Sequence, residues 1–211
     1  MTGLRERQKQ GREARILAAA AELFETQGYG GTAIQEIAGR AELAVGTIYN
    51  YFRSKPEIVL AIVRRDTAEA LAAGEEVLKH PPRDPVGAVT ALLERAIEPF
   101  ARHDRALWRE LVAAALLDPK LAAGLFAEDL RLVGELSALL RELQARGDLR
   151  PELDAGRAAV ALYGVFFSWF MAFVASDAVA IGAVRAELAQ GIGLVMHGLL
   201  ARAPSEARRA T

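Results

Sequence analysis

The segment VGTIYNYFRSKPE, from Val45 to Glu57, brings together aromatic, hydroxyl, amide and basic side chains within a few helical turns. At 100° per residue, Ile48 and Phe52 fall on one face of a short helix, with Tyr49 on the flank. The opposite face carries small and hydrogen-bonding residues: Gly46, Thr47, Asn50 and Tyr51. Because Gly46 has no side chain, another surface can approach this face closely. We therefore expect a helix held by its apolar face that presents polar groups to another molecule.

The flanking sequence predicts helices on both sides of this segment. Apolar residues recur at spacings of three and four from about Gly11 to Gln27, and Gly28 ends that pattern. Thr32–Gln35 has the form of a capping box, which opens a short helix to about Arg40. A tight turn leads to the short helix from Val45 to about Tyr51. Ser54–Glu57 is a second capping box, which opens a long helix to about Lys79.

The remainder of the chain is also predicted to be helical. The break HPPRDP at 80–85 is followed by helical patterns over 85–102, 105–117, 119–146, 155–175 and 178–202. Their N-caps are Asp84, Asp104, Asp118, Asp154 and Ser176 or Asp177; Gly147 is a C-cap, and Pro99 should kink or end its helix. The expected fold is all-α with about nine helices. We expect a helix-turn-helix domain over 1–53, a regulatory domain over 54–203 and a disordered tail over 204–211.

Charge and composition are compatible with a cytoplasmic protein that binds a polyanion. The chain has no cysteine, and its first residues contain no apolar segment of the kind found in signal peptides. Residues 1–65 carry 10 Lys/Arg against 7 Asp/Glu, whereas the remainder carries 16 against 20. A basic end on a weakly acidic chain is compatible with nucleic-acid binding.

The uncharged run AAVALYGVFFSWFMAFVAS, residues 158–176, is long enough to approach the thickness of a bilayer. No second such run exists, and Gly164 and Ser168 interrupt this one. A helix buried on all sides, in a core and a subunit interface, is the preferred interpretation, with no membrane partner.

Two short helices joined by a tight turn suit a helix-turn-helix, in which the second helix lies in the major groove. Thr47 and Asn50 then have suitable groups for base edges, and Tyr49 and Tyr51 send hydroxyl groups to phosphates. Lys55 supplies a point charge for a phosphate, and Thr32 and Gln35 act similarly at the start of the preceding helix. The alternative is that these are ordinary short helices of a protein that never touches DNA.

Residues 12–60 resemble the N-terminal domain of the TetR family of bacterial transcriptional regulators. The similarity rests on Phe24, Gly28-Tyr29, Thr32, Ile37-Ala38, and Gly46-Thr47-Ile48-Tyr49-x-Tyr51-Phe52 followed by Lys55. The resemblance implies a homodimeric repressor. It implies that bases or neighbouring phosphates are met by Gln35, Val45, Gly46, Thr47, Asn50 and Tyr51, and that Thr32, Tyr49 and Lys55 hold the DNA backbone.

Three positions depart from the family pattern. Glu42 stands where the turn usually has glycine, and a left-handed backbone there costs about 1 kcal/mol. Ala44 replaces the usual serine cap, and Val45 offers only apolar contact.

Aromatic residues concentrate in the C-terminal part, where ordinary core packing competes with a ligand pocket. The candidate pocket residues are Trp108, Phe126, Tyr163, Phe166, Phe167 and Phe170, which suit an apolar, acyl or aromatic effector. The family resemblance implies a dimer interface built from the helices near 155–175 and 178–202. Several glycines there allow close helix approach: Gly164, Gly191, Gly193 and Gly198.

Other functions are weakly supported by the residues. No catalytic constellation suggests an enzyme, and no cofactor motif is present. His103 and His197 lack acidic companions at metal spacing, so no metal site is expected. A helical scaffold whose DNA binding has decayed through Glu42, Ala44 and Val45, and a transcriptional activator of the same fold, remain alternatives.

Overall fold

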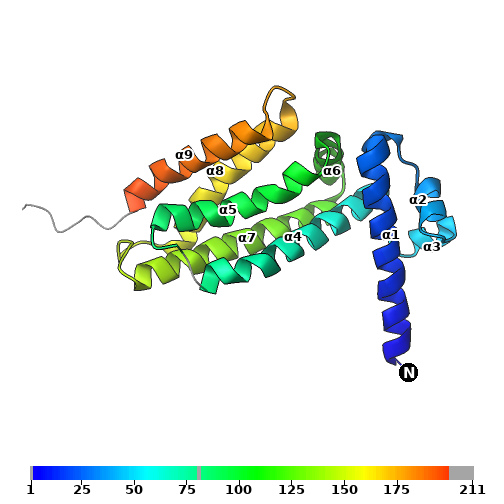
Figure 1. The fold of residues 1–211 in the computed structure, drawn as a ribbon, viewed down its shortest axis with the longest axis horizontal. Coiled ribbons are helices and arrows are strands. Elements are labelled where there is room, and N and C mark those ends of the chain that lie inside the picture. Colours follow the sequence, from blue (N-terminus) through cyan, green and yellow to red (C-terminus); the bar gives the residue numbers. More distant parts are fainter. Residues whose placement is uncertain (1, 80–81, 200–211) are drawn as a thin grey trace, which may run out of the picture. The chain divides into compact units, whose positions relative to one another are not determined.

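The computed structural model describes the backbone of residues 2–79 and 82–199 and the side chains of residues 3, 6–66, 68 and 82–198. The described backbone is all-α, as predicted, and Figure 1 shows its helices. They are α1 (Thr2–Gly31), α2 (Ile34–Arg40), α3 (Val45–Tyr49), α4 (Lys55–Lys79), α5 (Pro85–Arg102), α6 (Arg105–Leu117), α7 (Pro119–Ala145), α8 (Ala155–Ala175) and α9 (Ile181–Leu199). The predicted tail over 204–211 lies outside the described residues.

Several predicted helix ends are confirmed, and others are wrong. α3 ends at Tyr49 rather than near Tyr51, and α1 ends at Gly31 rather than near Gln27. α5, α6 and α8 have the predicted bounds, and α5 continues past Pro99 to Arg102. α1 begins at Thr2 rather than near Gly11, because one glycine inside a helix costs only about 1 kcal/mol and does not stop it. α9 begins at Ile181 rather than 178. Gly28 breaks the helical conformation near the end of α1, with φ 74°.

Side-chain caps explain where the C-terminal helices begin. The carboxylate of Asp104 accepts from the N–H of Ala106 at 3.1 Å, and that of Asp154 accepts from Arg157 at 3.0 Å. Asp84 and Asp118 cap α5 and α7 in the same way. These acceptors satisfy N–H groups that have no partner inside the helix.

The chain forms two compact units. The first unit comprises Met1–Glu69 and Glu98–Ala127, and the second comprises Ala70–Ile97 and Glu128–Thr211. The compact units therefore do not divide at the predicted boundary between residues 53 and 54, because α4 belongs to both. The functional division into a DNA-binding and a regulatory part stays a prediction.

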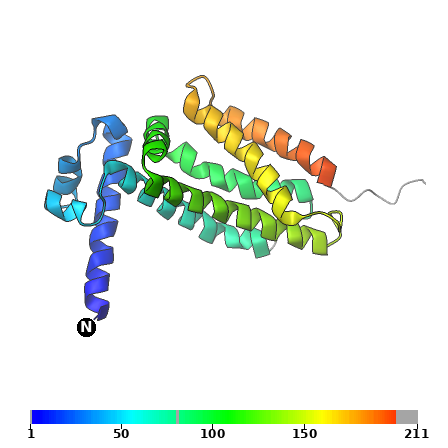
Figure 2. The same ribbon diagram turned by 180° about the vertical axis from the view of Figure 1, so that it is seen from behind.

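The core of the first unit holds α3 in place. α1 packs against α2 and α6, and α2 packs against α3 (Figure 2). The fully buried side chains of this unit come from five helices: Ile16, Ile37, Ile48, Ile58, Ile62, Leu107 and Leu111. Burying such aliphatic side chains contributes about 1.5–3 kcal/mol each, so the short helices are stabilised by tertiary packing.

In the second unit, α8 and α9 lie side by side and antiparallel (Figures 1 and 2). A Cβ atom on Gly191 of α9 would lie 2.8 Å from Cγ1 of Val165, so this glycine permits the close approach of α9 to α8. Within the described residues, α8 alone is long and apolar enough to cross a membrane by length and composition, and 33% of its most apolar window is buried. Within a single chain, burial of α8 on all sides is therefore not observed.

Candidate nucleic-acid interface

The two faces predicted for α3 are confirmed by side-chain exposure. Ile48 is fully buried and Phe52 is 7% exposed, so both anchor the helix to the first unit. On the opposite face, Gly46 and Asn50 are exposed and Thr47 and Tyr51 are half-buried. Tyr49 on the flank is exposed, and Val45 is half-buried. Gln35 on α2 is also exposed. The polar and small groups of α3 are thus accessible while its apolar groups hold it in place.

The turn before α3 has the backbone strain expected at Glu42. Its φ is 53°, the left-handed conformation that glycine adopts without cost. Arg15 of α1 supports this turn: its guanidinium donates to the carbonyl of Ala41 and lies 3.2 Å from the Glu42 carboxylate. The glutamate therefore makes an ion pair that glycine could not make, although exposed pairs contribute only about 0–1 kcal/mol.

α3 begins without a side-chain cap, as predicted from Ala44. The backbone of Ala44 is extended, with φ −71° and ψ 144°, and its carbonyl accepts from the N–H of Thr47 at 2.8 Å. The methyl side chain leaves a first-turn N–H group without the acceptor that serine would provide. Before α4, the Glu57 carboxylate accepts from the N–H of Arg53 at 2.6 Å, one residue earlier than the predicted capping box requires.

The predicted capping role of Thr32 is wrong. α2 is capped at Ala33, where the Glu36 carboxylate accepts from the Ala33 N–H at 2.7 Å. Thr32 is only 2% exposed, and its hydroxyl donates to the carbonyls of Gly28 at 2.9 Å and Leu23 at 3.2 Å. The sequence contains two overlapping capping patterns, and the tertiary structure uses the second. The Thr32 side chain therefore caps the end of α1, and the DNA contact of Thr32 stays a prediction.

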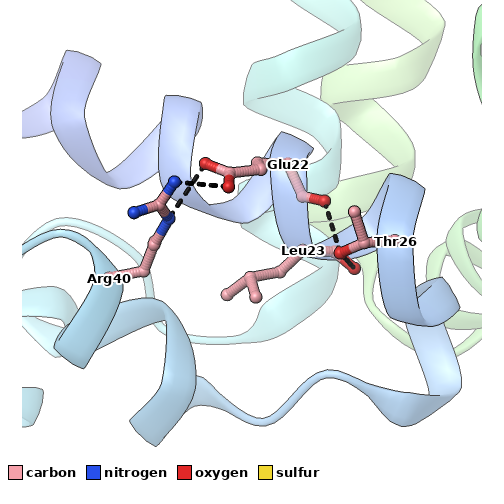
Figure 3. Close-up of polar contacts among 4 residues, drawn as sticks. All are labelled: Glu22, Leu23, Thr26 and Arg40. Carbon is pink, nitrogen blue, oxygen red and sulfur yellow. Dashed lines mark hydrogen bonds and ion pairs between the residues drawn. The ribbon is translucent and has the colours of Figure 1, made fainter.

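A salt bridge between α1 and α2 fixes the position of the helix-turn-helix. The guanidinium of Arg40 binds both carboxylate oxygens of Glu22, with Nε at 2.9 Å from Oε2 (Figure 3). Hydrogen bonding to Glu22, followed by its charge, raises the pKa of Arg40. Eighteen residues separate the partners, so no local pattern in the sequence predicts the pair.

Lys55 has a structural role that the sequence did not predict. Its Nζ donates to the carbonyls of Tyr29 at 2.6 Å and Thr32 at 2.9 Å, and lies 3.9 Å from the centre of the Tyr29 ring. Burial lowers the pKa of Lys55, and the charge of Glu110 opposes that effect. An ammonium group has three donors, so one remains for a phosphate. The phosphate contact stays a prediction.

A buried hydrogen-bonded pair in the first unit was also not predicted. Nε2 of His103 lies 2.7 Å from Oδ2 of Asp66, and the two side chains are 4% and 6% exposed. Burial would raise the pKa of Asp66, but the hydrogen bond and charge of His103, together with Arg65, hold it below its ordinary value. The pair ties α4 to the end of α5, and His103 is thus a satisfied histidine.

The predicted pocket residues fall into two groups. Trp108 and Phe126 belong to the first unit, where Trp108 is buried edge-on against Phe100 at 4.7 Å and Phe126 is 60% exposed. The other four form a continuous aromatic stripe on α8 in the second unit, with ring centres 5.8–6.2 Å apart: Tyr163, Phe166, Phe167 and Phe170. The structure thus does not unite the six residues in one cluster.

The stripe on α8 has a polar neighbour on α7. Asp129 is half-buried and forms a hydrogen bond with the Tyr163 side chain. Burial raises the pKa of Asp129. The hydrogen bond with Tyr163 lowers that pKa, and the negative charge of Glu128 raises it further. Burial and Asp129 in turn raise the pKa of Tyr163.

Comparisons with known proteins agree with this architecture. Residues 16–62 match the sequence model of "Bacterial regulatory proteins, tetR family". The chain is 26% identical over 190 residues to the HTH-type transcriptional regulator UidR of Escherichia coli K12, with 88% of this chain and 91% of UidR covered. It is 29% identical over 166 residues to the HTH-type transcriptional repressor KstR of Rhodococcus jostii, with 77% and 73% covered.

A solved structure is similar along nearly its whole length. The Thermus thermophilus FadR, a TetR-family transcriptional repressor in complex with lauroyl-CoA, has a TM-score of 0.72 and 28% identity, with 92% of this chain and 98% of that chain covered. These relatives are DNA-binding transcriptional regulators and not enzymes. With the exposed polar face of α3 in the matching domain, these similarities establish that the chain belongs to the TetR family of bacterial transcriptional regulators.

Proposed function

We propose that this protein is a ligand-responsive repressor that binds a palindromic operator as a homodimer. The observation that carries the proposal is the contrast between two buried anchors, Ile48 in α3 and Phe52 shortly after it, and the accessible polar groups on the opposite side. Two subunits would place their α3 helices in successive major grooves, about 34–36 Å apart.

The DNA contacts divide into base and backbone contacts. Base edges and their neighbouring phosphates are met by Gln35, Val45, Gly46, Thr47, Asn50 and Tyr51. Tyr49, which is 52% exposed, and the remaining donor of Lys55 hold the DNA backbone. Thr32 is also proposed to hold the DNA backbone, although its buried side chain donates to carbonyls of its own chain.

The dimer is proposed to form through α8 and α9. Both helices expose large apolar side chains: Val160 is 57% exposed, Phe167 40% and Leu194 79%. A Cβ atom on Gly164 or Gly193 would meet nothing within 4 Å, which leaves room for a second pair of helices. An uncovered apolar surface on α8 is better explained by a partner subunit than by a membrane, and we place the protein in the cytoplasm.

The effector is proposed to be an apolar or acyl small molecule bound in the second unit. The aromatic stripe on α8 supplies apolar surface, and the relative from Thermus thermophilus binds lauroyl-CoA. α4 belongs to both compact units, so a ligand that favours one conformer of α4 changes the spacing of the α3 helices.

A gel-shift experiment on the DNA flanking the gene tests the proposal. Thr47→Ala combined with Asn50→Ala should abolish the shifted band, whereas Thr26→Val, an exposed change elsewhere in the same unit, should retain it. Reporter expression should rise when the gene is deleted; a fall would indicate an activator. Absence of binding by the wild-type protein would favour the scaffold alternative.

A further inference from the structure

The N-terminal part of α1 extends beyond the core of the first unit. The first buried side chain of this helix is Ile16, and the described side chains before it are exposed, apart from the half-buried Glu13. Residues 2–15 nevertheless continue the helix over about 20 Å, at 1.5 Å per residue. They project past α2 and α3 in both views (Figures 1 and 2). Core packing therefore does not explain this segment, which we call the basic arm.

The basic arm places cations where a helix disfavours them. Residues 1–15 contain five Lys/Arg and two Asp/Glu, and the first turn of α1 has no acidic residue. The helix dipole favours negative charge at this end, so these cations weaken the helix. Arg7, Lys9 and Arg12 are exposed, and their side chains make no hydrogen bond or ion pair within the part of the chain that the structure describes. A bound polyanion would neutralise them and remove their unfavourable interaction with the dipole.

Arg15 shows which side of the basic arm faces the helix-turn-helix. Its guanidinium donates to the carbonyl of Ala41, in the turn that leads into α3, and pairs with the carboxylate of Glu42. At 100° per residue, Arg12 lies about 60° and Arg7 about 80° around the helix from Arg15. The two glutamates of the arm lie about 160–180° from Arg15. The cations are therefore gathered on the side that continues toward the start of α3, and the acidic groups lie on the other side.

We infer that the basic arm is a second DNA-binding element, which binds backbone phosphates beside the groove that α3 enters. This inference rests on the proposed function, because it places the duplex against α3. Charge complementarity and continuity with the turn before α3 both favour DNA as the partner. Double-stranded DNA carries one negative charge per about 1.7 Å of its axis, so a helix about 20 Å long can meet several phosphates. Contacts to phosphates carry no sequence information, so the arm should strengthen binding to any duplex.

A variant with both Arg7→Gln and Arg12→Gln tests the inference. Fluorescence anisotropy measures its affinity, at several salt concentrations, for the DNA flanking the gene and for a random-sequence duplex of the same length. Four charges are lost per dimer, so the slope of log K against log salt concentration should fall by about 3–4. The affinity for both duplexes should fall at least tenfold near 0.1 M salt. The melting temperature should change by less than about 2 °C, because the two side chains are exposed and glutamine has a similar helix propensity.

The matched control removes the same charge elsewhere on the surface. Arg102→Gln combined with Arg141→Gln replaces two exposed arginines, one on α5 and one on α7. This variant should keep the wild-type salt slope and bind both duplexes within about twofold. Replacing Arg7 and Arg12 by lysine keeps the charges and should preserve most of the affinity.

Three results would overturn the inference. The glutamine variant of the arm could bind both duplexes like the wild type. The control could lose as much affinity as the arm variant, which would mean that only net charge matters. The lysine variant could bind as weakly as the glutamine variant, which would mean that the charges of the arm are not the cause.

The two duplexes separate this inference from the proposed function. Thr47→Ala combined with Asn50→Ala should lose the preference for the flanking DNA but keep the arm-dependent binding to the random duplex. If the wild type bound both duplexes equally and the arm variant lost both, only the proposed operator recognition would be refuted. If the wild type preferred the flanking DNA and the arm variant did the same with unchanged affinity, only the role of the arm would be refuted. A wild type that bound neither duplex at low salt would refute both.

Discussion

Replacing Thr32 by valine tests whether this residue serves the fold or the DNA. The substitution keeps the shape of the side chain but removes the hydroxyl that donates to the carbonyls of Gly28 and Leu23 at 2.9 and 3.2 Å. Because Thr32 is 2% exposed, water cannot replace these bonds. We expect the free energy of unfolding to fall by about 1–2 kcal/mol, the usual cost of leaving a buried polar group without its partner. For a chain of this size, that corresponds to a melting temperature lower by roughly 2–8 °C.

Thr26 provides a matched control on the same helix. Its hydroxyl donates to the carbonyls of Glu22 and Leu23 at 2.9 and 3.4 Å, the same two-acceptor arrangement, but it is exposed (Figure 3). Thr26→Val should change the free energy of unfolding by less than about 0.5 kcal/mol, because water replaces the lost bonds. Urea unfolding followed by circular dichroism measures both variants, and titration of operator DNA measures affinity. If Thr32→Val were as stable as the wild type but bound DNA tenfold more weakly, the assignment of Thr32 to the fold would be refuted.

Three further predictions concern other sites in the first unit. Asp66→Asn should lower the free energy of unfolding by about 1–3 kcal/mol at pH 7, since a neutral amide replaces the carboxylate that binds the buried His103 side chain. The pKa of Asp66 is lower in the folded state than in the unfolded state. Its contribution to the free energy of unfolding is therefore fully present above the unfolded pKa, which is near 4, and is lost as the pH falls through the lower folded pKa. The difference in urea unfolding between the wild type and Asp66→Asn should shrink in that pH range, and a pH-independent difference would contradict the argument. Ala44→Ser should stabilise the protein by about 1 kcal/mol in thermal unfolding by capping α3, and no gain would mean that the cap geometry is different. Lys55→Met should destabilise the protein by about 2 kcal/mol, because it removes the hydrogen bonds to the carbonyls of Tyr29 and Thr32. It should also reduce the slope of log K for operator binding against log salt concentration by about 2 per dimer. An unchanged slope would contradict the phosphate contact of Lys55.

Local patterns were sufficient for most of the helices. Prolines and capping aspartates mark the starts of α5, α6, α7 and α8, because an unpaired N–H group needs an acceptor within a few residues of the chain. Patterns failed where two of them overlapped, as at Thr32 and Ala33. There the choice depended on the burial of Thr32 and on its hydrogen bonds to carbonyls near the end of α1, which a capping motif does not describe.

By itself, the sequence determined the all-α fold, the amphipathic character of α3, the strained turn at Glu42 and the family resemblance, because each depends on residue types within a few turns of helix. Only the tertiary structure decided which polar groups are used internally. It placed the Lys55 ammonium group on carbonyls at the end of α1 and paired Asp66 with His103. These contacts depend on which side chains from distant parts of the chain come together and on whether water reaches them. Residue spacing and composition therefore do not predict them.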